Sequence, residues 1–219
     1  AKLNKMFQNR CRAGQALAKM LLPYQSEDTI VLGIPRGGVP VAFEIAIYLK
    51  KPLGIVLVKK IGHPMNKEFA IGAVSLNTEI IHSNHKISEA YIQNEVDAIR
   101  QRLLEMKNYF KGRDHTNMQL KDKVVILVDD GLATGNTMLN SIALIKKCHP
   151  KKIVVAIPIA PKEAIDAIKK EGVTLVVIEI PYFFNGIGAF YEDFTQVENE
   201  IVLDLLESKQ LIANKSENY

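Results

Sequence analysis

Short apolar runs alternate with stretches of helical periodicity along this chain, and this alternation restricts the possible folds more than any other feature of the sequence. Continuous apolar strands separated by helices are typical of a parallel sheet that is covered on both faces. We therefore predict an α/β fold with a mainly parallel central sheet flanked by helices. The predicted strands are Thr29–Ile34, Leu53–Val58, Val124–Val128, Ile153–Ile157 and Thr174–Ile180.

Apolar residues spaced three or four apart fill the intervals between these strands and predict helices there. Ser88 can cap the longest helix and Gly112 can end it. Between the second and third strands, Ala70–Val74 and Glu79–His82 predict a β-hairpin that turns at Asn77-Thr78. The predicted helices are Arg10–Leu22, Val39–Leu49, Ser88–Lys111, Asn136–Lys147, a helix that follows Pro161 and runs to Lys170, and Val197–Ser208.

The composition is that of an ordinary globular protein. Of 219 residues, 47% are hydrophobic and 24% are charged, which excludes a disordered, collagenous or disulfide-scaffolded chain. A chain of this length buries roughly 70% of the surface that it exposes when unfolded, so it needs no covalent staple. No linker divides the sequence, and we expect a single domain over residues 1–219.

The two cysteines, Cys11 and Cys148, lie far apart and belong to no CxxC or Cys/His pattern. This spacing excludes zinc ribbons and thioredoxin chemistry and favours a reducing, cytoplasmic location. No apolar run approaches the ~20 residues that a membrane span needs, and the first residues lack the apolar core of a signal peptide. The expectation is a cytoplasmic protein with no membrane partner.

The formal net charge of +4 comes with lysine pairs that are scattered along the chain. Aromatic residues make up only 7% and do not interleave with the basic pairs, as a stacking platform for nucleic acid would require. We expect no nucleic-acid partner, because a small anionic ligand accounts equally well for the mild positive charge.

The segment Val124–Met138 carries most of the recognisable chemistry. Open parallel sheets bind ligands beyond the carboxyl ends of their strands, where Asp129 and Asp130 follow the third predicted strand. Thr134–Thr137 then offers hydroxyl and backbone N–H groups at a helix N-terminus, which favours a phosphate. The two carboxylates would repel that phosphate but can accept hydrogen bonds from the hydroxyls of a sugar. The segment therefore predicts a site for a sugar phosphate with free vicinal hydroxyls.

Two better-known phosphate motifs do not describe this segment. It lacks the lysine and spacing of a GxxxxGK[ST] loop, and it lacks the three glycines of the dinucleotide fingerprint. The alternative is a strand-to-helix turn in which aspartate and threonine are only capping residues. A Thr-Gly-x-Thr pattern alone would not exclude that alternative, but the whole segment favours a ligand site.

The segment Val124–Met138 resembles the 5-phosphoribosyl-1-pyrophosphate (PRPP) motif of type I phosphoribosyltransferases. Gly33–Pro40 resembles the pyrophosphate loop of that family, and Val58–Pro64 resembles the start of its mobile catalytic loop. Together with Glu68–Val74, these segments resemble a group of bacterial predicted phosphoribosyltransferases of unassigned substrate. The likeness runs from about Phe7 to the end of the chain. It implies the type I phosphoribosyltransferase fold, in which a small hood, here from about 1–24 and 181–219, covers the base.

The resemblance also implies roles for individual residues. Asp129 and Asp130 would bind the ribose hydroxyls and contact Mg²⁺ only indirectly, through the ribose or water. Arg36, Gly37 and Gly38 would hold the pyrophosphate. The 5′-phosphate would be wrapped by the loop residues Ala133, Thr134, Gly135, Asn136 and Thr137.

Lys59 and Lys60 resemble a basic pair that follows the second strand in some members of the family. One of them should reach the pyrophosphate, and we favour Lys60, so that the candidate catalytic residues are Lys60, Arg36 and Asp130. The family often has a non-proline cis peptide in the pyrophosphate loop, which predicts one at Pro35–Arg36. Glu68, more simply an exposed surface residue, and His63 are weaker candidates, and His82 and His85 lack a third metal ligand.

The family relationship implies Mg²⁺ as a substrate-bridged cofactor, PRPP and a nitrogenous base as substrates, and a homodimer. Ala133 stands where hypoxanthine-guanine members have an aspartate, so the acceptor base stays open. The aromatic residues within 181–191 could stack on a base or belong to the core. Two other functions also stay open: a PRPP- or nucleotide-sensing regulator without turnover, and hydrolysis or phosphorolysis of a different ribose phosphate.

Overall fold

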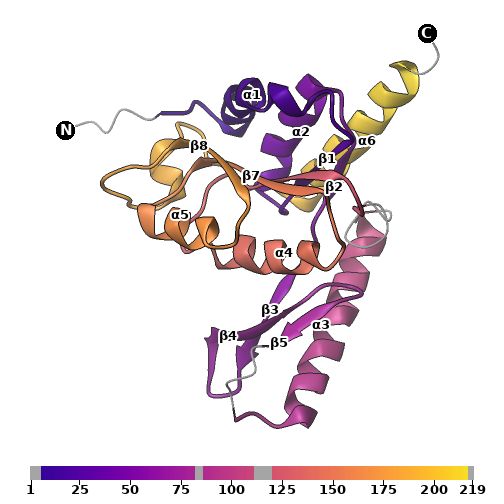
Figure 1. The fold of residues 1–219 in the computed structure, drawn as a ribbon, viewed down its shortest axis with the longest axis vertical. Coiled ribbons are helices and arrows are strands. Elements are labelled where there is room, and N and C mark those ends of the chain that lie inside the picture. The colour runs from indigo at the N-terminus through magenta and orange to yellow at the C-terminus, as the bar shows by residue number, and fades with distance from the viewer. Residues whose placement is uncertain (1–5, 82–85, 111–119, 217–219) are drawn as a thin grey trace.

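The computed structural model of the chain describes residues 6–81, 86–110 and 120–216, without the side chains of 68 and 210–216. Its centre is a five-stranded parallel sheet with the order β2-β1-β6-β7-β8 (Figure 1). This sheet confirms the predicted α/β class. Its strands are β1 (Thr29–Gly33), β2 (Leu53–Ile55), β6 (Val124–Val128), β7 (Lys152–Ile159) and β8 (Thr174–Glu179).

Helices cover both faces of this sheet, as the continuous apolar strands require. One face is covered by α1 (Arg10–Met20), α2 (Gly38–Leu49) and α6 (Asn199–Ser216), and the other by α4 (Asn136–Lys146) and α5 (Lys162–Lys169) (Figure 1). Successive side chains of each strand enter opposite cores. Val31, Ile126 and Val154 pack towards the first set of helices, whereas the neighbouring Ile30, Leu127 and Val155 pack towards the second.

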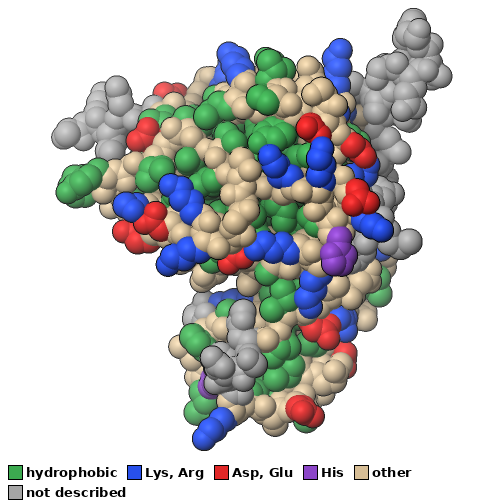
Figure 2. Space-filling view, in the orientation of Figure 1, with side chains coloured by type: hydrophobic (Ala, Val, Ile, Leu, Met, Phe, Trp, Pro, Cys, Tyr) green, Lys and Arg blue, Asp and Glu red, His purple; other side chains and the backbone are tan. Residues whose placement is uncertain are grey.

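A second, antiparallel sheet forms an arm that projects from the body (Figure 1). It has the order β3-β4-β5 and lies beside the long helix α3 (Glu89–Tyr109). The outline of the molecule narrows between this arm and the body (Figure 2). The strands are β3 (Lys59–His63), β4 (Asn66–Val74) and β5 (Glu79–Ile81).

The arm corrects the sequence-based expectation for residues 58–74. Lys59–His63 is a strand rather than the start of an irregular loop, and β4 begins at Asn66 rather than at Ala70. The Tyr91 hydroxyl of α3 donates a 2.7 Å hydrogen bond to the carbonyl of Gly62 and ties the strand to the helix. Lysine and glycine are poor strand formers, so the pairing partner, not local propensity, stabilises this edge strand.

The helix boundaries follow the expected capping chemistry. Ser88 caps α3, as predicted, by accepting a hydrogen bond from the N–H of Tyr91 at 3.3 Å. The predicted stop at Gly112 lies outside the described residues. The last helix is α6, which extends eight residues beyond the predicted end at Ser208 to Ser216.

The N-terminal segment of the described chain meets the segment that follows β8 above the carboxyl edge of the sheet. Phe7 forms an isolated parallel bridge with Tyr191 and packs with it against Ile159, the last residue of β7. A short 3-10 helix, η2 (Ile187–Phe190), precedes this bridge, and another, η1 (Leu22–Tyr24), follows α1. None of the described helices is both long and apolar enough to cross a membrane.

Candidate active site

The loops that follow β1 and β6 come together at the carboxyl edge of the sheet. Gly33 of β1 is paired with Val128 of β6, so both strands end at the same level. The N–H of Ile34 donates to the carbonyl of Val128 at 2.9 Å and continues the pairing by one residue. The peptide bond that follows, Pro35–Arg36, is cis, which confirms the prediction for this loop.

Two glycines let the first loop lie directly against the two carboxylates of the second. A Cβ on Gly37 would come within 2.1 Å of Asp130 Oδ2. A Cβ on Gly38 would come within 2.9 Å of the Cα of Asp129 and within 2.7 Å of the carbonyl oxygen of Val128. Any larger side chain at either position would displace the carboxylates, so the close approach requires glycine at both.

The two carboxylates share a crowded environment. The N–H of Asp130 donates to Oδ1 of Asp129 at 2.8 Å. Burial of the Asp129 carboxylate is the main reason why its pKa lies well above the ordinary aspartate value, and the nearby charge of Asp130 raises this pKa further. The hydroxyl of Tyr191 donates to the carbonyl oxygen of Asp130 at 2.7 Å, and burial raises the pKa of this tyrosine.

Arg10, at the start of α1, forms an ion pair with Asp130 that sequence reasoning missed. Its Nε lies 2.8 Å from Asp130 Oδ2, and the side chains are only 11% and 10% exposed. The same guanidinium donates through Nη1 to the carbonyl of Thr195 at 2.7 Å and lies 3.9 Å above the ring centre of Phe194. No local pattern marks Arg10, because its partners lie 120 and 185 residues away along the chain.

The loop between β6 and α4 is open to solvent at the positions expected to hold a phosphate. Gly135 adopts φ +78°, in the left-handed region that favours glycine, and stands at the N-cap of α4. The N–H of Leu132 donates to the carbonyl of Ile159 at 2.9 Å and anchors the loop to β7. The first N–H groups of α4 have no acceptor inside the helix, and together with the helix dipole they favour an anion. The exposed members of this loop are Ala133, Thr134, Asn136 and Thr137.

Asp130 faces a cavity of about 380 Å³. Arg36 also lines this cavity; its side chain is 40% exposed, and its guanidinium lies 3.5 Å from the carboxylate of Glu198. The carboxylate of Asp130 is therefore directed towards an open site, although one of its oxygens is held by an arginine. The cavity is lined by Arg10, Arg36, Gly37, Asp130, Phe194, Gln196 and Val197.

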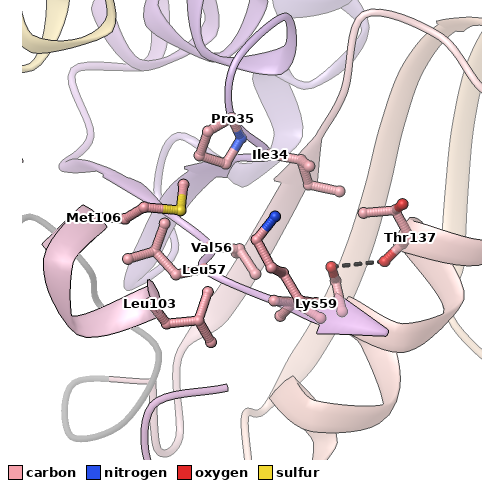
Figure 3. A pocket seen from close by; sticks show the side chains of 10 residues that line it. Ile34, Pro35, Val56, Leu57, Lys59, Leu103, Met106 and Thr137 are labelled. Carbon is pink, nitrogen blue, oxygen red and sulfur yellow. Dashed lines mark hydrogen bonds between the residues drawn. The ribbon is translucent and has the colours of Figure 1, made fainter. Parts of the chain in front are cut away.

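A second, smaller cavity of about 90 Å³ lies where the arm joins the body (Figure 3). Pro35, Lys59 and Thr137 line it, and the ammonium group of Lys59 points towards Pro35 (Figure 3). Lys60 is the next residue of β3, so its side chain leaves the strand on the opposite face. The structure thus brings Lys59, and not the favoured Lys60, next to the first loop. The remaining walls come from Ile34, Val56, Leu57, Val58, Leu103, Met106 and Ser141.

The aromatic residues after β8 divide into two groups. Phe190 and Tyr191 belong to the core, where Phe190 stacks on Phe184 at 5.9 Å between ring centres. Tyr182 and Phe183 are 93% and 75% exposed and line a separate cavity of about 730 Å³. That cavity shares no lining residue with the one at Asp130, so the structure does not bring these two rings to the candidate ribose site.

The weaker candidates lie away from this edge or outside the described residues. His63 packs edge-on against Phe69 in the arm at 6.1 Å between ring centres. The side chain of Glu68, and both His82 and His85, are outside the described part of the chain. Among the residues that the structure describes, no group of three or more histidine, cysteine, aspartate or glutamate side chains could hold a metal ion.

Comparison with known proteins identifies the family. A model of the phosphoribosyl transferase domain matches residues 8–192. Two Mycobacterium tuberculosis proteins, from strains CDC 1551 and H37Rv, whose names assign them provisionally as phosphoribosyl transferases, are each 33% identical over 214 residues. These matches cover 93% of this chain but 47% of the relatives, so the chain spans about half their length.

A solved structure, that of TT1426 from Thermus thermophilus, is similar over nearly its whole length. It is 35% identical, with a TM-score of 0.83, and the match covers 92% of this chain and 98% of the Thermus protein. The fold, the loops at its carboxyl edge and these matches agree: the chain belongs to the type I phosphoribosyltransferase family.

Proposed function

We propose that this protein transfers the phosphoribosyl group of PRPP to a nitrogenous base and releases pyrophosphate. The observation that carries the proposal is the meeting of the two loops at the carboxyl edge of the sheet. Gly37 and Gly38 bring the first loop against Asp129 and Asp130, beside the solvent-exposed start of α4. A single ligand that carries a sugar diol between two phosphate-bearing groups would match this arrangement, because the diol can donate to the carboxylates and the phosphates can accept from the N–H groups.

Each part of such a ligand has a matching group in the site. The loop at Thr134–Thr137 would hold the 5′-phosphate through hydroxyls and N–H groups at the helix N-terminus. Asp129 and Asp130 would accept hydrogen bonds from the ribose hydroxyls. Arg36 would donate to the pyrophosphate, since its planar fork can form two hydrogen bonds with one phosphate.

We further propose that Lys59, rather than Lys60, provides the second positive charge for the pyrophosphate. Its ammonium group points towards Pro35 from the arm and shares a cavity with Thr137 (Figure 3). A bound pyrophosphate beside Arg36 would therefore have a cation on each side, one from the first loop and one from β3.

The reaction breaks the bond between C1 of the ribose and the pyrophosphate oxygen, and the electron pair leaves with pyrophosphate. A nitrogen of the acceptor forms the new bond to C1 and later loses its proton. The protein contributes by holding both reactants in line and by stabilising the negative charge that develops on the leaving group. Arg36 and Lys59 would perform that second task.

The donor set fits a magnesium ion that is held mainly by the substrate. Magnesium prefers oxygen ligands and commonly binds through one or two carboxylates, water and substrate phosphates. Asp129 and Asp130 supply the only such carboxylates among the described residues that form the two loops, and they would reach the ion through water or the ribose. When bound, Mg²⁺ would neutralise charge on the pyrophosphate, so the cofactor is proposed as substrate-bridged.

Thermal unfolding with and without Mg²⁺-PRPP tests binding. At a hundredfold excess over the Kd, PRPP should stabilise the fold by about 2.7 kcal/mol. For a domain of this size, that corresponds to a rise of about 5–11 °C in Tm. Asp129→Asn is the matched variant, because it removes one ribose acceptor and keeps the side-chain volume.

Pyrophosphate release in the presence of separate purines, pyrimidines and nicotinate then tests turnover. Release with one acceptor and not with the others supports the enzyme and names its substrate. Binding of PRPP without release for any acceptor supports a sensor in place of the transferase. No change in Tm with PRPP, in wild type and Asp129→Asn alike, would refute the proposed function.

A further inference from the structure

Arg10 joins three parts of the chain at the candidate ribose site. It lies at the start of α1, binds the carboxylate of Asp130 after β6, and binds the carbonyl of Thr195 near α6. Its guanidinium also lies 3.9 Å above the ring centre of Phe194. A side chain with three separate partners and only 11% exposure has little freedom to rotate, so it forms a fixed wall of the site.

The contact with Arg10 involves one particular oxygen of Asp130. Nε of Arg10 lies 2.8 Å from Oδ2, and the backbone of Gly37 lies against that same oxygen. A Cβ on Gly37 would be 2.1 Å from Oδ2 but 3.3 Å from Oδ1. Oδ2 is therefore enclosed by two neighbours, and Oδ1 is the oxygen left for a ligand in the cavity that Asp130 lines.

Charge provides a second reason for an arginine at this place. Asp129 and Asp130 are adjacent residues, the first half-buried and the second buried, and like charges in such surroundings repel each other. Arg36 lines the same cavity, but its guanidinium lies near Glu198 and its side chain is 40% exposed. Arg10 is the cation in hydrogen-bond contact with Asp130, so it can hold that carboxylate in place beside Asp129.

We infer that Arg10 is a positioning residue for the ribose site: it fixes the carboxylate of Asp130 so that Oδ1 faces the ligand. The inference rests on the proposed function, because it assumes that Asp130 binds the ribose of PRPP. Arg10 acts through Asp130 and does not itself touch the reacting atoms.

The geometry of the guanidinium explains why lysine would replace it only in part. A planar fork can bind Asp130 and Thr195 at the same time while its face rests on Phe194. A lysine could restore the ion pair with Asp130 but would lose this simultaneous contact. A methionine would keep a long apolar side chain on Phe194 and remove the charge altogether.

The test compares Arg10→Met and Arg10→Lys in steady-state kinetics with Mg²⁺-PRPP, or in PRPP titrations if turnover is slow. Arg10→Met should raise the KM or Kd for PRPP about 10- to 100-fold, the loss expected for a charged hydrogen bond, with a smaller change in kcat. Arg10→Lys should recover at least part of that loss. The affinity for free pyrophosphate should change little in both variants, because pyrophosphate does not use Asp130.

Arg12→Met is the matched control. Arg12 lies on the same helix, where its guanidinium donates to Gln15, and it does not line the cavity. This variant should bind PRPP like the wild type. A double-mutant cycle with Asp130→Asn completes the design, because a residue that acts through Asp130 should have little further effect once that carboxylate is gone.

Three outcomes would overturn the inference. If Arg10→Met and Arg10→Lys lose the same PRPP affinity and also the same amount of Tm, Arg10 has only a packing role. Additive effects in the cycle with Asp130→Asn would show that Arg10 does not act through Asp130. If the wild-type protein binds no PRPP, the proposed function is refuted as well. This outcome is measured before any variant is made, so it can be told apart from a failure of the inference on Arg10.

Discussion

Replacement of Gly37 by alanine is the most direct test of the contact between the two loops. Gly37 has φ −63° and ψ −30°, which any residue adopts, so the backbone itself tolerates alanine. The new Cβ, however, would lie 2.1 Å from Asp130 Oδ2 and 2.7 Å from its Cγ, whereas ordinary contacts begin at 3.4 Å. The carboxylate must therefore move by about 1 Å, away from the position in which Arg10 holds it.

This displacement has two measurable effects. Inserting a methyl group into a filled site costs about 1–3 kcal/mol of unfolding free energy. A carboxylate that no longer meets the ribose loses charge-assisted hydrogen bonds worth about 1.5–3 kcal/mol, so the Kd for PRPP should rise about 10- to 150-fold. Isothermal titration with Mg²⁺-PRPP measures the affinity, and urea unfolding measures the stability.

Gly62→Ala is the matched control for Gly37→Ala. Its Cβ would lie 2.6 Å from the carbonyl oxygen of Lys67, so the steric conflict is similar, but it lies in the arm and away from both carboxylates. We expect a loss of stability with little change in PRPP affinity. If Gly37→Ala binds PRPP as tightly as Gly62→Ala does, the carboxylate of Asp130 is not part of the PRPP site.

Three other sets of variants probe the surroundings of the same site. Burial and a neighbouring charge raise the pKa of Asp129 in the folded state, so its ionisation destabilises the fold as the pH rises above about 4. Asp129→Asn should therefore have a higher Tm than the wild type in calorimetry at pH 7. A gain in Tm that stays constant down to pH 4 would contradict this reasoning. Lys59→Ala should weaken competitive inhibition by pyrophosphate more than Lys60→Ala does. The reverse order would favour Lys60, the residue preferred from the sequence, as the pyrophosphate ligand. Tyr191→Phe leaves the carbonyl of Asp130 without its 2.7 Å partner and should lower the unfolding free energy by about 1–3 kcal/mol in urea; an unchanged value would mean that water replaces the hydroxyl.

The features that sequence predicted well depend on residues close together in the chain. The central strands β1 and β6 are continuous apolar runs, so their burial on both faces could be predicted without knowledge of their neighbours. The cap at Ser88 needed only the residues of one helical turn. The cis bond at Pro35–Arg36 came from the resemblance of one loop to a known family.

The features that sequence missed depend on partners that are distant in the chain. Lys59–His63 is a strand because β4 pairs with it and Tyr91 ties it to α3, and neither interaction leaves a local signal. Lys59 and Lys60 are neighbours, so only the register of that strand decides which of them faces Pro35. Arg10 resembles any other helical arginine until Asp130 and Thr195 are placed beside it.

The long sequence separation of the groups around Arg10 has a consequence for biosynthesis. Asp130 leaves the ribosome 120 residues after Arg10, and Thr195 leaves it 185 residues after Arg10. Local helices form quickly, whereas contacts that close such long loops form slowly. A nascent chain halted before Thr195 would therefore carry the phosphate loop without its finished wall, so ligand capture should begin only after Thr195 has been made.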